Sequence, residues 1–397
     1  MTTIPSLARR LDSVQSSAIR DLLALTARDD VISLAGGLPA TELIPAQRVR
    51  EAAAAVLSEP QAVQYGETPG WRGLREVIAG RESDAIGRVV DPSNVVVTHG
   101  SQQALTLVAQ ALVDPGTVVV VDEPAYTGAL QVFSIAGADI HAIPIAADGM
   151  DTYELERRLA AGLRPALVHT VANFHNPRGV TMSHDKRAHL AALADRYGFW
   201  ILEDDPYGEI WFDAPPSPPI AAHSDRVVRL SSASKILAPA LRVGWMVAPK
   251  RVCDAVELLK QGADLCGSSM TQQMTAEMLS DTSWLGMHLE RLRSAYGQRA
   301  TALRTAVEAE FDDRVHISPA DGGMFVWLTF RDGTDTTALL PTALENGVAF
   351  VPGRAFADAP QYSGAARLCF ASSAEPVLQE AVRRLKSAHA DTAHTLS

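Results

Sequence analysis

The stretch SSASKILAPALRVGW (residues 231–245) carries Lys235 in a turn of small and hydroxyl-bearing residues between two apolar runs. Only five of the 35 basic residues in the chain are lysines. A lysine that faces a partly dry crevice at a sheet edge has two uses, as a fixed cation or as an amine of lowered pKa that attacks carbonyl groups. The stretch alone leaves both uses open. We expect the other lysines to lie on the surface: Lys186, Lys250, Lys260 and Lys386.

Composition narrows the class of protein. A chain of 397 residues with 47% hydrophobic content exceeds the size at which one core usually stops growing, so we expect two domains. The net charge of -11 and the lack of a basic block argue against nucleic acid or a membrane as partner. No signal-peptide run and no membrane-length apolar run occurs, so the expected location is cytoplasmic. The three cysteines lack the spacing of a metal site, and we expect no metal.

Short β-branched runs alternate with helix-length segments through the first two thirds of the chain. Near-continuous apolar strands separated by helices predict a mainly parallel α/β sheet covered on both faces. We expect helices to begin near Ser101 and Thr127 and to span 186–199. The predicted strands are 94–99, 117–122, 165–171, 200–205, 226–231 and 242–249.

The pattern changes after residue 284. A long helix over 284–310 leads into shorter strands mixed with helices at 336–346 and 375–388. This indicates a second, smaller α+β domain. We expect a large domain over 46–290 and a small domain made of 1–45 and 291–397.

A phosphate site is indicated where the strand VVVTH runs through a Gly-Ser turn into a helix. The backbone amides of Ser101 and Gln102 lie at that helix N-terminus, which favours an anion. Ser232, Ser234 and Arg242 add hydroxyl donors and a guanidinium that pairs with phosphate through two bonds. Neither GxGxxG nor GxxxxGKS occurs, so a dinucleotide or a nucleoside triphosphate is a poor candidate for the ligand that carries this phosphate.

Acidic and amide side chains follow two other predicted strands. In ILEDDPYGEIW (201–211), Asp204 and Tyr207 end a buried strand, where open parallel sheets bind ligands. Asn176 follows a strand in ANFHNPRGVTMS (172–183). Each also has a simpler interpretation, as a cap for Asp204, a packing residue for Tyr207 and a turn residue for Asn176.

Seven motifs occur together in one order: GSQQAL, DEPAY, HNPRG, EDDPYGE, SASKILAPALRVGW, DGGMF and ARLCF. In this order and spacing the chain resembles the class I aminotransferases, which are pyridoxal-phosphate enzymes of fold type I. The opening SAIRDLLALTARDDVISLAGGLPATELIP is similar to that of the 2-aminoadipate and kynurenine aminotransferases. The resemblance implies a large domain with a mainly parallel seven-stranded sheet, a smaller α+β domain and pyridoxal 5'-phosphate as cofactor.

The resemblance assigns roles to the residues around the cofactor. Lys235 forms the imine with the cofactor and then acts as the general base at the substrate Cα. Asp204 pairs with the pyridine nitrogen, which keeps the ring an electron sink. Tyr207 and Asn176 donate to the phenolic oxygen, and Tyr126 stacks on the ring.

Further residues are implied for the phosphate and for the dimer. The phosphate is held by Ser101, Gln102, Ser232, Ser234 and Arg242. Tyr65 matches a tyrosine that reaches the phosphate in the neighbouring subunit, so a homodimer with shared active sites is expected; the alternative for Tyr65 is a turn residue.

The implied substrate site centres on arginine. Arg367 matches the residue that binds the α-carboxylate through two bonds, a task for which lysine is poorly suited. Asn176 and the backbone of Gly37 lie near the same carboxylate. Arg20 matches an arginine that meets a distal carboxylate, or else decorates an amphipathic helix. If Arg20 binds the distal carboxylate of a substrate, glutamate and 2-oxoglutarate are natural co-substrates.

The chain departs from the family pattern at His175, Arg178, Trp71 and Arg354. These positions bear on substrate choice, although we expect His175 and Arg178 to form a solvated loop pair. The predicted function is a ping-pong aminotransferase that exchanges an amino group between an L-amino acid and a 2-oxo acid. The alternatives are a decarboxylase, β-lyase or amino acid oxidase on the same scaffold. A ligand-sensing domain fused to a DNA-binding module is disfavoured, because no basic winged-helix segment precedes residue 20.

Overall fold

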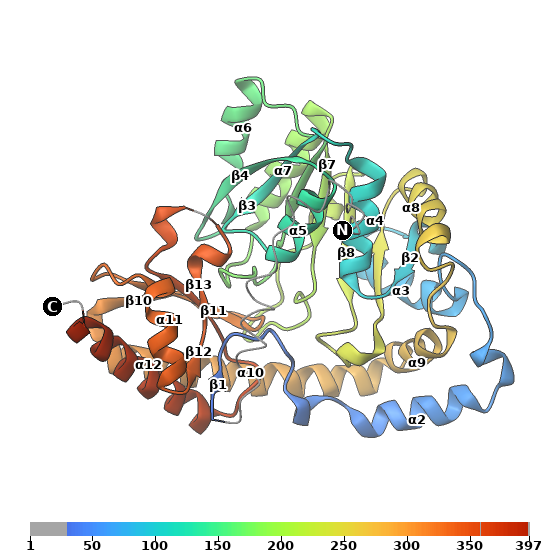
Figure 1. Ribbon diagram of the computed structural model, residues 1–397. Helices are drawn as coiled ribbons and strands as arrows, with labels where there is room; N and C mark the ends of the chain where they lie inside the picture. Colours follow the sequence, from blue (N-terminus) through green and yellow to red (C-terminus); the bar gives the residue numbers. More distant parts are fainter. Residues whose placement is uncertain (1–29, 358, 396–397) are drawn as a thin grey trace, which may run out of the picture.

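A computed structural model of the chain describes residues 30–357 and 359–395 (Figure 1). A large sheet of eight strands and a smaller sheet of four strands lie on either side of the molecule, and the long helix α10 (Thr282–Phe311) runs beneath both (Figure 1). The fold is therefore α/β with a smaller second part, as the sequence predicts.

The large sheet is parallel through its centre. Its strands, in spatial order, are β2 (Val95–Thr98), β9 (Gly244–Val247), β8 (Val227–Ser232), β7 (Trp200–Asp204), β6 (Leu167–Thr170), β3 (Val118–Glu123), β4 (Asp139–Ala146) and β5 (Gly149–Met150). The strands from β8 to β4 pair in parallel, whereas β9 is antiparallel to both neighbours. The resemblance implies a sheet of seven strands, and the structure has eight. The additional strand at the edge, β5, has two residues and is antiparallel to β4.

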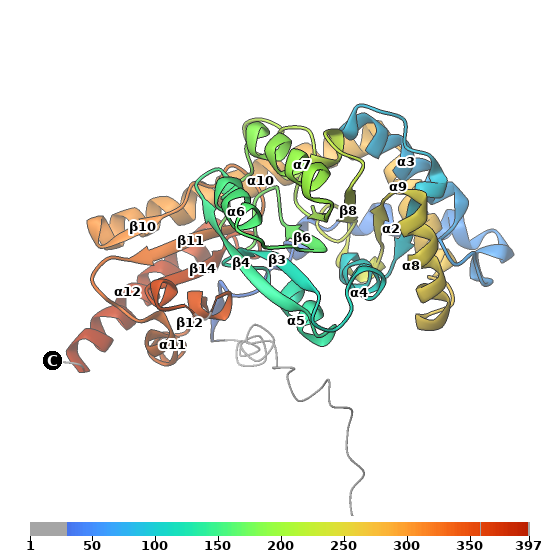
Figure 2. The same ribbon diagram turned by 90° about the horizontal axis from the view of Figure 1, so that it is seen from above.

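Alternate residues of the central strands face different apolar cores, because successive side chains of a strand point to opposite faces. Val119 and Val121 of β3 pack with α4 (Ser101–Leu112), α5 (Thr127–Ile135) and α8 (Lys250–Ala263). Val120 packs on the other face with α6 (Thr152–Ala160) and α7 (His184–Tyr197) (Figure 2). Burial on both faces explains the run of four valines at residues 118–121 of β3.

The remaining helices of this half and the long helix share the largest core. It includes side chains of α2 (Ala46–Leu57), α3 (Arg72–Ile86), α9 (Ser269–Ser280) and α10. The expected boundary between residues 290 and 291 falls inside α10, and the domain limits stay a prediction. Among the described residues, no helix is long and apolar enough to cross a membrane.

The smaller sheet has the order β10 (Val315–Ile317), β11 (Phe325–Phe330), β14 (Ala365–Cys369) and β13 (Val351–Pro352), with every pair antiparallel. It lies beside α11 (Thr336–Glu345) and α12 (Glu375–Thr395). The short strand β1 (Ile32–Ser33) pairs in parallel with β12 (Val348–Ala349), which brings the N-terminal segment beside this part of the chain.

Most of the predicted elements are confirmed, but strands β1, β4 and β5 were not predicted. The helices expected from Ser101 and Thr127 begin at those residues. Strand β4 was not predicted, because its burial is irregular: Asp139 is exposed, the next three residues are half-buried, and Pro144 is exposed between the buried Ile143 and Ile145. Such a strand lacks the continuous apolar run by which its neighbours were recognised.

Candidate active site

One cavity of about 500 Å³ gathers most of the predicted site residues at the carboxyl ends of the parallel strands. Asp204 ends β7, Asn176 follows β6, Tyr126 follows β3 and Lys235 follows β8. The chain therefore brings residues from widely separated segments to one crevice. The cavity is lined by Gly37, Ser101, Gln102, Tyr126, Thr127, Gly128, Gln131, Val171, Asn176, Asp204, Pro206, Tyr207, Lys235, Phe325 and Arg367.

The Lys235 amine lies inside this cavity. Its Nζ donates a hydrogen bond of 2.7 Å to the carbonyl oxygen of Gly37. Burial, together with the nearby guanidinium of Arg367, lowers the pKa of Lys235 to about 8. A larger neutral fraction at physiological pH suits an amine that attacks a carbonyl group, because only the free amine is nucleophilic.

Selective acylation of the apoenzyme tests this lowered pKa. The labelling rate of Lys235 by acetic anhydride, followed by peptide mapping, is expected to rise with pH to a midpoint near pH 8. Lys250 is the internal control, because its hydrogen bond to Asp254 raises its pKa above the ordinary lysine value. Its labelling should rise only at much higher pH, and coincident profiles for the two lysines would contradict the assignment.

Asp204 presents an unsatisfied acceptor at the base of the cavity. The residue is 4% exposed, and its Oδ1 has no hydrogen-bond partner among the residues that the structure describes. Its Oδ2 lies 3.8 Å from Nε2 of the buried His169. An unpaired buried acceptor costs about 1–3 kcal/mol. A donor from a bound molecule, such as a protonated ring nitrogen, would remove that cost.

The aromatic residues form the walls. The hydroxyl group of Tyr126 donates to Oε1 of Gln102 at 3.1 Å. Burial raises the pKa of Tyr126 to about 12 and raises that of Tyr207 as well, so both phenols stay protonated and available as donors. The ring of Tyr207 meets Phe325 edge to face at 5.9 Å.

The N-terminus of α4 forms the end of the cavity where the sequence predicts a phosphate site. The preceding Gly100 has φ 76° and ψ 165° and lies against the guanidinium of Arg242, where an added Cβ would approach Nη2 to 2.5 Å. Only glycine allows this conformation and this close approach without strain. Arg242 donates to the carbonyl oxygen of His99 at 3.0 Å. It is thereby held beside the free amides of the helix.

Three predicted phosphate residues do not line the cavity. Arg242 lies beside it, as described above. Ser232 and Ser234 are joined by a hydrogen bond of 2.8 Å between their hydroxyl groups. Ser232 lines a second cavity on the other side of the turn.

Two lysines that were expected on the surface are buried, and one of them, Lys260, belongs to a charge cluster beneath the α4 turn. Lys260 was predicted to be a surface lysine, but it is 0% exposed and donates to Asp264 at 2.7 Å. His99 and Gln103 contact the same carboxylate at 2.8 and 2.7 Å. Lys186 is likewise buried, with its amine 2.6 Å from Asp148.

Arg367 supplies a buried cation that lacks a carboxylate partner among the described residues. It is 2% exposed, and it donates to Oδ1 of Asn176 at 2.7 Å and to the carbonyl oxygen of Ala35 at 2.5 Å. Its guanidinium lies 4.3 Å from the ring centre of Phe325. Burial lowers the pKa of Arg367 to about 10, so the group keeps its charge near neutral pH. A buried unpaired guanidinium attracts an anion from solution.

Some lining residues were missed by sequence reasoning. Phe325 belongs to the quoted motif DGGMF but had no assigned role, although it contacts both Tyr207 and Arg367. An added Cβ at Gly37 would lie 2.8 Å from the Phe325 ring, so the two residues close one end of the cavity together. Local sequence carries no signal for Thr127, Gln131, Val171 or Pro206.

Three sequence predictions fall elsewhere. Tyr65 is 81% exposed and lines a separate surface pocket. Arg20 lies outside the described residues. The expectation of a solvated pair at His175 and Arg178 is wrong, because His175 is 2% exposed with Nε2 3.2 Å from Asp122, and Arg178 is half-buried. In the described part of the chain, no group of three or more acidic, His or Cys side chains is placed to hold a metal ion.

Comparison with known proteins identifies the class. The chain matches the family described as aminotransferase class I and II over residues 29–385. It is 37% identical over 380 residues to aromatic-amino-acid aminotransferase 1 of Thermococcus litoralis, across 94% of this chain and 91% of that protein. It is similar to the structure of Pyrococcus horikoshii kynurenine aminotransferase in complex with PMP (35% identity, 97% of each chain, TM-score 0.91). It is also similar to α-aminoadipate aminotransferase of Thermus thermophilus complexed with N-(5'-phosphopyridoxyl)-L-leucine (34% identity, 98% of each chain, TM-score 0.89).

The fold is thus that of the fold type I transferases that depend on pyridoxal phosphate. The chain belongs to the class I and II aminotransferases, and it is a pyridoxal-phosphate-dependent aminotransferase. Pyridoxal 5'-phosphate is its cofactor. The cavity suits that molecule, because an amine, an unsatisfied buried acceptor and a helix N-terminus converge on it.

Proposed function

We propose that the enzyme exchanges amino groups between an L-amino acid and a 2-oxo acid in a ping-pong reaction, with glutamate and 2-oxoglutarate as one pair. The observation that carries the proposal is the buried guanidinium of Arg367, which faces the cavity without a carboxylate partner in the described chain. A substrate α-carboxylate supplies the missing charge. The α-aminoadipate relative is named for an amino acid with two carboxylates, which supports a dicarboxylic pair.

Each cavity residue has a proposed task in this reaction. The bound cofactor supplies an electron sink for the carbanion at the substrate Cα. The amine of Lys235 moves the proton at Cα, and the Asp204 carboxylate holds a proton on the ring nitrogen. Tyr207 and Asn176 donate to the phenolic oxygen. This assignment is supported by the low pKa of Lys235 and by the unpaired Oδ1 of Asp204.

The remaining contacts are assigned from the motifs that the chain shares with the family. Arg367, Asn176 and the backbone of Gly37 hold the α-carboxylate, and Arg20 the distal one. Tyr126 covers the ring. The phosphate is held by Ser101, Gln102, Ser232, Ser234 and Arg242.

We also propose a homodimer in which Tyr65 reaches the partner's phosphate site, and a cytoplasmic location. Exposed apolar side chains support the dimer, since Tyr65, Val63 and Leu265 are 81%, 70% and 55% exposed in the single chain. Sedimentation of the holoenzyme checks this arrangement, and an active monomer would contradict it.

A single-turnover assay tests the substrate pair. L-Glutamate added to holoenzyme without an oxo acid is expected to release one 2-oxoglutarate per subunit and to bleach the visible cofactor band. Aminoadipate, kynurenine and phenylalanine are run in parallel, and the Lys235→Ala variant is the control that should release no product. If another donor bleaches the band while glutamate does not, the glutamate pair is excluded and the aminotransferase assignment is retained.

A further inference from the structure

Two adjacent acidic residues at the end of β7 line different cavities. Asp204 lines the cofactor cavity, whereas the next residue, Asp205, lines a second cavity of about 440 Å³. The two carboxylates point to opposite sides because side chains alternate along an extended chain. Pro206 lines both cavities and separates them. Asp205 therefore lies behind the site and does not touch its contents.

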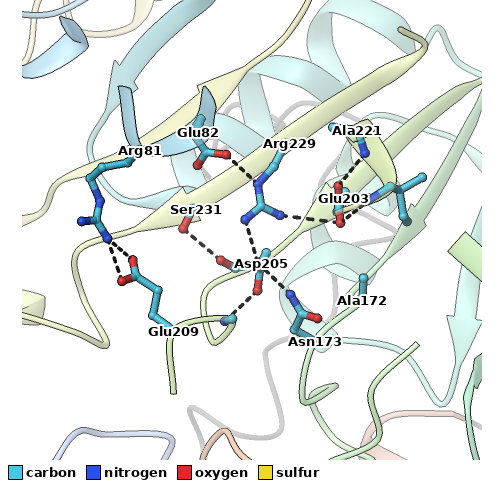
Figure 3. A network of polar contacts seen from close by, with 12 residues as sticks. Arg81, Glu82, Ala172, Asn173, Glu203, Asp205, Glu209, Ala221, Arg229 and Ser231 are labelled. Carbon is cyan, nitrogen blue, oxygen red and sulfur yellow. Dashed lines mark hydrogen bonds and ion pairs between the residues drawn. The ribbon is translucent and has the colours of Figure 1, made fainter. Parts of the chain in front are cut away.

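Asp205 accepts hydrogen bonds from three chain segments that carry residues proposed to contact the cofactor (Figure 3). Its Oδ1 accepts from the backbone amide of Gly208 at 2.8 Å, which closes the turn that contains Tyr207. Its Oδ2 accepts from Nδ2 of Asn173 at 2.9 Å, in the segment that leads to Asn176. Its carbonyl oxygen accepts from the hydroxyl group of Ser231 at 2.9 Å, near the end of β8 before Lys235.

A buried arginine holds the Asp205 carboxylate in place. Nη2 of Arg229 donates to Oδ2 of Asp205 at 2.8 Å, and Nε of Arg229 donates to Glu82 at 2.8 Å. Glu82 also accepts from Nε1 of Trp245 at 3.1 Å. Both Asp205 and Arg229 are buried, at 4% and 8% exposure. Charged hydrogen bonds in such surroundings are strong and directional.

The Asn173 arm is fixed from its other end. Nη2 of the fully buried Arg187 donates to Oδ1 of Asn173 at 2.5 Å and to the carbonyl oxygen of Ala172 at 3.2 Å. The amide of Asn173 is thus held between Arg187 and Asp205. Little freedom is left to the segment that carries Asn176.

We propose that Asp205 is a positioning residue that sets the placement of Tyr207 and Asn176 against the phenolic oxygen of the cofactor. This inference rests on the proposed roles of those two residues. Donors to that oxygen stabilise its charged form and lower the pH at which the cofactor's visible band changes. A loosened Asp205 network raises that pH midpoint, because the two donors are no longer held at the oxygen.

Spectral titration of Asp205→Asn holoenzyme tests the proposal, since the variant keeps the side-chain size and removes the charge. The pH midpoint of the visible band is expected to rise by about one unit, and kcat/KM to fall by roughly 10²-fold, as for small misplacements of reacting groups. Glu209→Gln is the matched control. Glu209 pairs with Arg81 in the same second cavity but does not contact Asp205, so its midpoint should equal that of the wild type.

Two further variants, Tyr207→Phe and Asn173→Ala, distinguish a failure of the positioning role of Asp205 from a failure of the proposed role of Tyr207. Tyr207→Phe tests the underlying role, and an unchanged midpoint there overturns the proposed function of Tyr207 itself. A shifted midpoint in Tyr207→Phe with a wild-type midpoint in Asp205→Asn overturns only the positioning role, whatever the thermal stability. If Asp205→Asn does not fold, Asn173→Ala removes one arm of the network, and a wild-type midpoint in that variant overturns the proposal.

Discussion

The Lys235→Ala variant is expected to bind the cofactor without a covalent bond and to lose turnover by about 10⁴-fold or more. General acid–base transfer typically contributes about 10²–10⁴-fold, and this variant also loses the nucleophilic amine. No other lysine lines the described cavity, so no neighbour replaces it. The amine's hydrogen bond to Gly37 is lost as well, but that bond is a small contribution beside the chemistry.

Steady-state kinetics and borohydride trapping measure this effect. Reduction of wild-type holoenzyme followed by peptide mapping should locate the cofactor on Lys235, and the variant should carry none. Lys250→Ala is the control, because Lys250 is exposed and pairs with Asp254, four residues away on α8. Turnover of Lys235→Ala near the wild-type value would remove Lys235 from the role of base.

The Arg367→Lys variant is expected to lower kcat/KM by roughly 10- to 100-fold, because each hydrogen bond to a charged group contributes about 1.5–3 kcal/mol. An ammonium group cannot reproduce the planar fork that bonds Asn176 and the Ala35 carbonyl while facing the substrate. It also loses the broad contact with the Phe325 ring. Arg367→Met should lower kcat/KM further than Arg367→Lys does, since it removes the charge as well.

Activity on a donor amino acid and on its α-amide is compared for each variant. This comparison distinguishes a lost contact with the substrate carboxylate from a general loss of folding or activity. The wild type is expected to lose much activity when the α-carboxylate becomes an amide, whereas Arg367→Met should lose little more. Such non-additivity is the mark of a direct contact. Arg383→Lys on α12 is the control, because that arginine is exposed and pairs with Glu380. Fully additive losses would place the carboxylate site elsewhere.

The strands and most helix starts were predictable because their causes are local. Residues 118–121 and Val95–Thr98 are unbroken runs of β-branched residues, and such a run between turn residues predicts a strand buried on both faces. Motif order, through the resemblance, also identified Asp204, Lys235 and Arg367, which line one cavity. Strand β4 was missed because its burial follows no regular pattern.

The burial of charged side chains was not predictable in the same way. Lys260 has an acid four residues on, a spacing that is the same for a solvated helix pair and for the buried bond to Asp264. His175 was expected in solvent, yet it is buried and pairs with Asp122 of β3. Adjacent acids at 204 and 205 look alike in the sequence, although one lines the cofactor cavity and the other a cavity behind it.

By itself, the sequence determined much of the local conformation of this chain: where apolar runs become strands and where helices begin. Only the tertiary structure decided which charges lack partners. Arg367 bonds to Ala35, 332 positions away, and to Asn176, 191 positions away. Desolvation and pairing depend on every group that packs around a charge, and those groups come together only when distant segments meet.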